Sequence, residues 1–437
     1  MPTPSPINPR PGRIAFRAAD RARAAIDRAL ATDAEVLART FTRFDAGRIA
    51  AEAEALDRDA ARRDGPLAGL AVSIKDLFDE AGETTTAGSS VLSGAPAATR
   101  DAEAVRRLRA AGAFGCGRTT MSEFAYSGVG LNPHFGDPGN ALDPARITGG
   151  STSGGALSVA LGIADVALGS DTGGSVRIPA ALNGLCGFKP TQGAVPLDGA
   201  FPLSGTYDSI GPLARSIAVC AAVHAMLSAS RPDADALPGR PRLGIARGVL
   251  TDGLDAQVAR DFAAALEALR AAGWELVEAD TPFLDGFGNV NRVVVASEAH
   301  VIHRDRLDLL ETAGDPRVLK RIRAAESVSD NDLADARAQR AAAIAAFGKA
   351  AAGFDAFLAP TLPTVAPLIA EVEADFDRLN ALMLRNPSAI NFLDGCAATV
   401  PTHGGQALAT GLMIFAPGGA DWRVLALAER AEAALSS

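Results

Sequence analysis

The pattern of apolar and polar positions along the chain switches repeatedly between helical and strand-like periods. Residues 14–64 are rich in alanine with interspersed arginine, aspartate and glutamate, which predicts two or three amphipathic helices. Short apolar runs follow at 67–77 and 113–118, with a helical pattern between them at 101–111. This alternation predicts an α/β fold with a mixed central sheet and helices on both of its faces.

The alternation continues beyond Pro232. Further strands are expected at 242–246, 274–278, 357–360, 399–401 and 411–415. Further helices are expected at 255–272, 297–310, 316–325, 330–351 and 421–435. The expected organisation is a helical N-terminal arm over residues 1–65 that packs on a catalytic domain over residues 66–437.

Composition narrows the class of protein. Lys and Arg number 42 against 51 Asp and Glu, and the net charge of −9 argues against a nucleic-acid partner. No apolar run is long enough to span a membrane, and residues 1–11 lack the apolar stretch of a signal peptide. The four cysteines are widely separated and the five histidines show no metal-binding spacing, so reduced thiols and no metal site are expected. A cytoplasmic enzyme fits this composition.

Three clusters of polar residues interrupt the pattern. Lys75 ends an apolar run, and burial there would lower its pKa and allow it to act as a base. The loop GGSTSGG at 149–155 opens a helix-compatible segment whose backbone N–H groups can hold a negative charge. In GSDTGGSVRIP at 169–179, glycines beside Ser175 permit a sharp turn that points N–H groups inward, as an oxyanion hole requires.

Together these clusters resemble the amidase signature family. The matching pieces are IKD at 74–76, EFA at 123–125, NPHFG at 132–136, GGSTSGG at 149–155, GSDTGGSVRIPA at 169–180, GFKPT at 187–191 and DSIGP at 208–212. The similarity is dense over the signature core, residues 66–217, and thinner at 355–363 and 397–405.

The resemblance implies the mixed α/β fold of that family and a serine–cis-serine–lysine triad. Ser175 matches the nucleophile, Ser151 the bridging serine that shuttles a proton, and Lys75 the base. The peptide bond before Ser151 is therefore expected to be cis. The oxyanion hole would consist of backbone N–H groups of Thr172, Gly173, Gly174 and Ser175. No metal or organic cofactor is required, and a homodimer is expected by analogy with the family.

One position departs from the family pattern. Thr152 follows Ser151 where the family has a serine, and its hydroxyl could keep the supporting hydrogen bonds. The ungapped match makes Ser151 the shuttle, whereas a shift of two residues would put Ser153 in that role.

The resemblance also marks candidate substrate contacts, namely Ala125, Tyr126, Gly150 and Arg177. Small Ala125 beside Tyr126 leaves room for a modest apolar or aromatic acyl group, although Tyr126 could equally be half-buried packing. Arg177 either binds a substrate carboxylate or braces the loop together with Asp171. Residues 290–400 are expected to close the pocket.

The implied activity is hydrolysis of the C–N amide bond of a small molecule through an acyl-serine intermediate on Ser175. The substrate is open among primary amides, aryl or fatty anilides, carbamates, and ureido compounds such as biuret or allophanate. A second hypothesis is the glutamine-hydrolysing subunit of a tRNA amidotransferase, against which Ile178 weighs because glutamine is common there in that subgroup. A third is a non-catalytic binding protein on the same fold.

Overall fold

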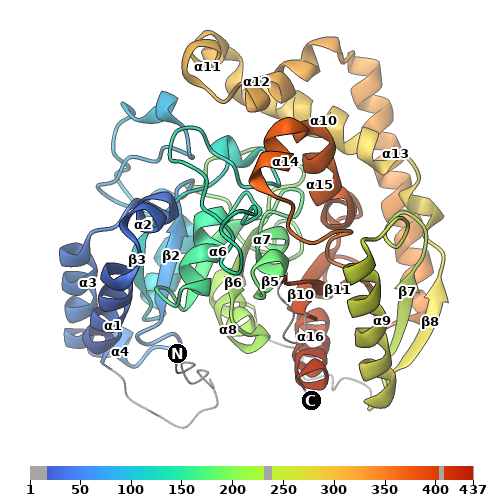
Figure 1. Cartoon of the computed structure of the whole chain (residues 1–437), viewed down its shortest axis with the longest axis horizontal. Coiled ribbons are helices and arrows are strands. Elements are labelled where there is room, and N and C mark those ends of the chain that lie inside the picture. The colour runs from blue at the N-terminus through green and yellow to red at the C-terminus, as the bar shows by residue number, and fades with distance from the viewer. Residues whose placement is uncertain (1–16, 231–238, 403–407, 437) are drawn as a thin grey trace.

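A single mixed sheet of eleven strands runs through the molecule (Figure 1). The computed structural model describes residues 17–230, 239–402 and 408–436. In spatial order the strands are β1 (Phe41–Arg43), β3 (Phe114–Thr119), β2 (Ala71–Lys75), β4 (Val166–Ser170), β6 (Ile210–Ala214), β5 (Cys186–Lys189), β10 (Cys396–Pro401), β11 (Gly411–Ala416), β9 (Ala356–Pro360), β7 (Arg242–Ala246) and β8 (Glu275–Ala279).

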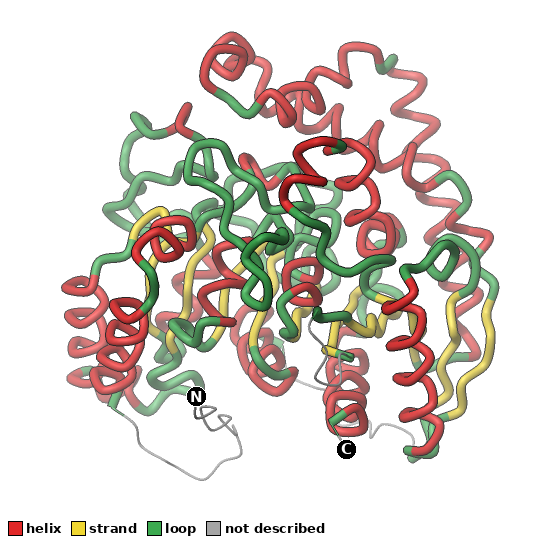
Figure 2. The backbone as a smooth tube through the Cα atoms, in the orientation of Figure 1, coloured by secondary structure: helices red, strands yellow, loops and turns green. Residues whose placement is uncertain are grey.

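Helices cover both faces of the sheet, as Figure 2 shows by their position around the strands. One face carries α5 (Glu103–Ala110), α8 (Ile217–Ser228), α16 (Asp421–Leu435) and α9 (Ala256–Ala271). The opposite face carries α1 (Ala18–Ala31), α3 (Ala46–Arg58), α6 (Ser153–Ala160), α7 (Arg177–Leu182), α15 (Phe376–Phe392) and α13 (Asp330–Ala350). The remaining helices are α2 (Ala34–Thr40), α4 (Ala60–Arg63), α10 (Phe287–His303), α11 (Leu307–Ala313), α12 (Pro316–Arg323) and α14 (Ile369–Ala374).

The position of Lys75 follows from the alternation of side chains along β2. Every residue of β2 is buried, and it pairs in parallel with β3 and β4. Val72 and Ile74 belong to the core between the sheet and the α5–α8 face. Ser73 points to the other face, where its Oγ lies 2.8 Å from Ser158 Oγ of α6. Two residues on, Lys75 shares that face at the carboxyl end of the strand.

The predicted α/β architecture is confirmed. The elements that differ from expectation include the N-terminal arm and two helices. The predicted helical arm, whose residues 1–16 lie outside the described residues, contributes a short edge strand, β1, that pairs with β3. Helix α10 begins at Phe287, ten residues before the expected start at Ser297. Helix α15 was not predicted, because Pro387 lies inside it. Among the described helices, none combines the length and apolar character needed to cross a membrane.

A cluster of phenylalanines stabilises the half of the sheet built from β9 and β11. Phe357 is 1% exposed, and its ring centroid lies 5.5 Å from that of Phe347 and 5.5 Å from that of Phe415. We expect Phe357→Ala to lower the free energy of unfolding by about 3–5 kcal/mol, since burial is lost and a cavity forms. Thermal and denaturant unfolding measure this.

The matched control is Leu309→Ala on α11, where the side chain is 57% exposed. That change should leave stability within about 0.5 kcal/mol of wild type. Equal effects of the two substitutions would contradict the assignment of Phe357 to the core.

Candidate active site

Lys75 lies fully buried between two serine hydroxyls. Its Nζ is 2.7 Å from Ser151 Oγ and 2.9 Å from Ser170 Oγ. Burial lowers the pKa of Lys75 to about 7, although the nearby carboxylates of Asp171 and Asp208 oppose that shift. Near neutral pH a large fraction of this amine is therefore uncharged and able to accept a proton.

The loop before α6 presents Ser151 to this amine. The peptide bond between Gly150 and Ser151 is cis, as expected. Lys75 contacts Ser151 and not Ser153, whose buried hydroxyl has no partner among the described residues, so the in-register alignment is favoured. The Thr152 N–H donates to the Ser175 carbonyl at 3.2 Å, which joins the loop of Ser151 to the loop of Ser175.

The Thr152 side chain does not make the hydrogen bonds that its hydroxyl was expected to preserve. Its Oγ1 is buried and has no partner in the described part of the chain. The side chain instead packs against Gly155 and Gly169: a Cβ added at either glycine would come within 2.7 Å of it. Thr152 thus fills space between two glycines, where its methyl group makes the contact with Gly155.

The turn that precedes α7 exposes backbone N–H groups beside Ser175. Of the four predicted oxyanion donors, Gly174 is already engaged: its N–H donates to Asp171 Oδ1 at 2.8 Å. The N–H groups of Thr172, Gly173 and Ser175 have no acceptor within the described residues. Gly174 has φ +121°, and a Cβ there would lie 2.4 Å from Pro387 Cβ of α15, so only glycine fits. The geometry narrows the predicted oxyanion hole to three donors.

A buried ion pair holds this turn in place. The Arg177 guanidinium donates to both oxygens of Asp171, at 3.0 and 2.9 Å, and to Asn391 Oδ1 at 2.7 Å. Burial raises the pKa of Asp171, but Arg177 outweighs this and lowers it to about 2. Arg177 has no exposed side-chain surface and its donors face protein groups, which favours the bracing role over contact with a substrate.

A second buried acid approaches the site from the loop before β6. Asp208 Oδ1 accepts the Thr172 hydroxyl at 2.6 Å, and its other oxygen accepts the N–H groups of Leu203 and Ser204. Burial raises the pKa of Asp208, while these hydrogen bonds oppose the shift. Asp208 thus fixes the Thr172 side of the turn, as Arg177 fixes the other side.

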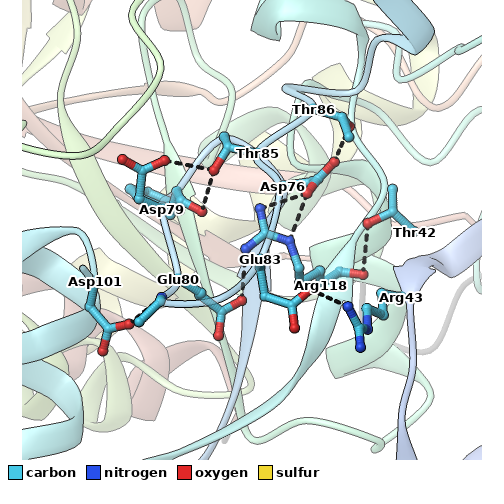
Figure 3. A network of polar contacts seen from close by, with 12 residues as sticks. Thr42, Arg43, Asp76, Asp79, Glu80, Glu83, Thr85, Thr86, Asp101 and Arg118 are labelled. Atoms are coloured by element: carbon cyan, nitrogen blue, oxygen red, sulfur yellow. Dashed lines mark hydrogen bonds and ion pairs between the residues drawn. The ribbon is translucent and has the colours of Figure 1, made fainter. Parts of the chain in front are cut away.

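A network of ion pairs surrounds Asp76, the residue that follows Lys75 (Figure 3). Asp76 faces Arg118, whose Nε donates at 2.8 Å, and also accepts the Thr86 hydroxyl. The same guanidinium reaches Glu80 at 2.8 Å, and Arg109 links Glu80 to the N-terminal arm. Because Asp76 follows Lys75 directly, this network anchors the backbone that carries Lys75.

Three of the four predicted substrate contacts, Ala125, Tyr126 and Gly150, lie on backbone that is tied to the loop of Ser151. Gly150 N–H donates to the Gly128 carbonyl at 2.8 Å, and Ser122 N–H donates to the Ser151 carbonyl at 3.2 Å. Ala125 and Tyr126 lie between these two tethers and are 5% exposed. The Tyr126 ring lies 4.2 Å from the guanidinium carbon of Arg321 on α12.

Comparison with known proteins agrees with this geometry. A family model described as Amidase matches residues 20–425. The chain belongs to the amidase signature family. A solved amidase structure superimposes with a TM-score of 0.86 at 34% identity and covers 96% of both chains. The present chain is accordingly an amide-hydrolysing enzyme.

Two curated proteins illustrate the range of similar amidases. The 2-amino-5-chloromuconic acid deaminase of Comamonas testosteroni is 32% identical over 90% of this chain and 88% of its own length. A glutamyl-tRNA(Gln) amidotransferase component of Synechococcus sp. (strain RCC307) is 37% identical over 63% of this chain. That alignment spans only 60% of the Synechococcus protein. Similarity thus extends to amidases with different named activities.

Several residues of this amidase site escaped the sequence analysis. Ser170 and Asp208 lie inside motifs that resemble the family. The sequence could therefore have indicated that they belong to the site. Asn391 and Arg321 come from α15 and α12, where the sequence carries no motif. Only the packing of the C-terminal helices brings them to the loops that hold Ser151 and Ser175.

The lowered pKa of Lys75 predicts the pH dependence of the amidase. Only the neutral amine accepts a proton, so kcat/KM for any hydrolysed amide should fall as pH drops through about 7. Lys75→Ala should lower kcat by about 10²–10⁴-fold, as expected for loss of a general base. Lys349→Ala, at the end of α13, is the control. A rate independent of pH between about 6 and 8, or more than about a tenth of the activity in Lys75→Ala, would refute the assignment.

The two roles of Arg177 predict different outcomes for Arg177→Met. If Arg177 braces the turn, Arg177→Met leaves Asp171 buried and unpaired, and the free energy of unfolding should fall by about 3–5 kcal/mol. If Arg177 instead binds the substrate, Arg177→Met would raise KM with little change in stability. Thermal unfolding and steady-state kinetics distinguish these results, with Arg270→Met, which breaks an exposed pair with Glu267, as control.

Proposed function

We propose that this amidase hydrolyses the C–N bond of a small-molecule amide through an acyl intermediate on Ser175. The observation that supports this most strongly is the buried amine of Lys75 in contact with Ser151. The next residue, Thr152, donates its backbone N–H to the Ser175 carbonyl. These hydrogen bonds connect Lys75, Ser151 and the loop of Ser175, which supports the proposed roles of base, shuttle and nucleophile.

The proposed reaction has two halves. Neutral Lys75 accepts the Ser151 proton while Ser151 accepts the proton of Ser175, whose Oγ then attacks the amide carbonyl. The free N–H groups of Thr172, Gly173 and Ser175 stabilise the oxyanion, and in other enzymes loss of one such donor costs about 2.7–4 kcal/mol. Ser151 returns a proton to the leaving amine as the C–N bond breaks. Water then attacks the ester through the same relay and releases the acid and Ser175.

The proposed relay accommodates several acyl groups and leaving amines. Primary amides, anilides, carbamates and ureido compounds all fit the same relay, because the chemistry acts only on the carbonyl and its nitrogen. The rival function is glutamine hydrolysis as a subunit of a tRNA amidotransferase. Ile178, which is fully buried against Gly149 and Gly174, presents an apolar side chain where that subgroup commonly carries glutamine.

Ammonia release by the purified chain tests the proposal. The panel contains primary amides, biuret, allophanate and glutamine, and Ser175→Ala is assayed beside wild type. We expect release that Ser175→Ala lowers by at least about 10³-fold, because the substitution removes the attacking oxygen. Release from glutamine alone would support the amidotransferase hypothesis instead.

Covalent labelling separates a catalytic from a binding role. A fluorophosphonate reacts with an activated serine, so the probe should label wild type and not Ser175→Ala. Ser153→Ala is the matched control, since its hydroxyl is buried in the neighbouring loop and has no partner among the described residues. Absence of labelling together with absence of turnover would favour the non-catalytic hypothesis.

A further inference from the structure

We propose that Arg321 binds a carboxylate of the substrate, which makes this enzyme a hydrolase of anionic amides. The inference rests on the proposed function and names the chemical class of its acyl group. It places a positively charged side chain of α12 above the loop that holds Ala125 and Tyr126.

Arg321 is joined directly to that loop. One of its N–H groups donates to the Tyr126 carbonyl, and its guanidinium carbon lies 4.2 Å from the centre of the Tyr126 ring. Two residues beyond Tyr126, the Gly128 carbonyl accepts the N–H of Gly150, the residue before Ser151. Two hydrogen bonds and the backbone from Tyr126 to Gly128 therefore connect the guanidinium to the residue before Ser151.

Arg321 differs from every other cation of α12 in lacking a carboxylate partner among the described residues. Arg317 pairs with Asp315 at 2.8 Å, Lys320 with Asp377 at 2.6 Å, and Arg323 with Glu311 at 2.8 Å. Within the described residues, Arg321 forms no ion pair, and its N–H groups other than the one on the Tyr126 carbonyl have no acceptor. The negative charge of Asp377 acts on Arg321 without forming an ion pair, so Arg321 lacks the direct carboxylate contact that its neighbours have.

Desolvation makes this lack of a partner costly. Arg321 is half-buried, and this burial lowers the pKa of its guanidinium, against the opposing effects of Tyr126 and Asp377. A desolvated charge is expensive unless an opposite charge meets it. A guanidinium with free N–H groups matches the two oxygens of a carboxylate, which is the bidentate arrangement that arginine forms best.

The Tyr126 hydroxyl adds to the same recognition surface. It makes no hydrogen bond with any described residue, and the positive charges of Arg321 and Arg292 both act on it. A phenol that can donate beside a free guanidinium forms a set of donors suited to an anion. The alternative is that Arg321 has only a structural role. It would then hold α12 against the loop through its hydrogen bond to the Tyr126 carbonyl and its contact with the Tyr126 ring.

Matched substrates separate the two roles. The probes are the monoamides of the C2–C5 dicarboxylic acids, namely oxamate, malonamate, succinamate and glutaramate, each compared with the n-alkanamide of equal carbon number. Wild type should prefer at least one anionic amide by about 10- to 100-fold in kcat/KM. In Arg321→Gln that preference should fall to about 1, and Arg321→Lys should restore part of it.

Lys320→Gln is the matched control, because this neighbouring cation is 71% exposed and paired with Asp377. It should keep the preference of wild type. If Arg321 has only this structural role, Arg321→Gln lowers kcat/KM for anionic and neutral amides by the same factor. The preference for anionic amides then survives. That result, or a wild type that prefers the neutral amides, would overturn the proposal.

Equilibrium binding decides the question without catalysis. Calorimetric titration of Ser175→Ala with the same monoamides should give a Kd that rises about 10- to 100-fold when Arg321→Gln is added. If none of the monoamides binds more tightly than its neutral match, the inference about Arg321 is wrong, whatever the turnover assays show. If binding depends on Arg321 but no amide is hydrolysed and Ser175 is not labelled, the hydrolytic function fails and the carboxylate site stands.

Discussion

Desolvation of the Lys75 amine is the constraint on which the rest of the site depends. Two buried acids, Asp171 and Asp208, would by themselves keep the amine charged, and only its complete burial lowers the pKa to about 7. The fold must therefore bury these acids near Lys75 and still satisfy them elsewhere. Arg177 neutralises Asp171, and hydroxyl and backbone N–H groups satisfy Asp208.

The same arrangement holds the nucleophile turn. Asp171 accepts the Gly174 N–H and Asp208 accepts the Thr172 hydroxyl, so each acid that acts on Lys75 also fixes one side of the turn before Ser175. The C-terminal helices complete the unit. Glu298 of α10 accepts the Thr206 N–H at 3.1 Å on the loop that leads to Asp208. Base, donors and covering helices are thus parts of one packed structure.

The α/β architecture could be predicted from the sequence because it depends on local signals, and the proposed triad follows from the resemblance of the motifs to the family. Alternation along β2 places Lys75, and glycines around Ser175 permit the turn. The hydrogen bond that engages the Gly174 N–H could not be predicted, since it depends on where the Asp171 side chain points. Asn391 and Arg321 reach the site only through the packing of α15 and α12, and helix α15 itself was obscured by Pro387.

Direct titration of the lysine amines tests the central claim most closely. The chain has only four lysines, Lys75, Lys189, Lys320 and Lys349, so ε-¹³C-labelled protein gives four resolvable signals. The signal that disappears in Lys75→Arg identifies the base. The account predicts that this signal titrates near pH 7, clearly below an ordinary lysine at about 10.4. A midpoint above about 10 would show a charged amine at neutral pH and contradict the proposed base.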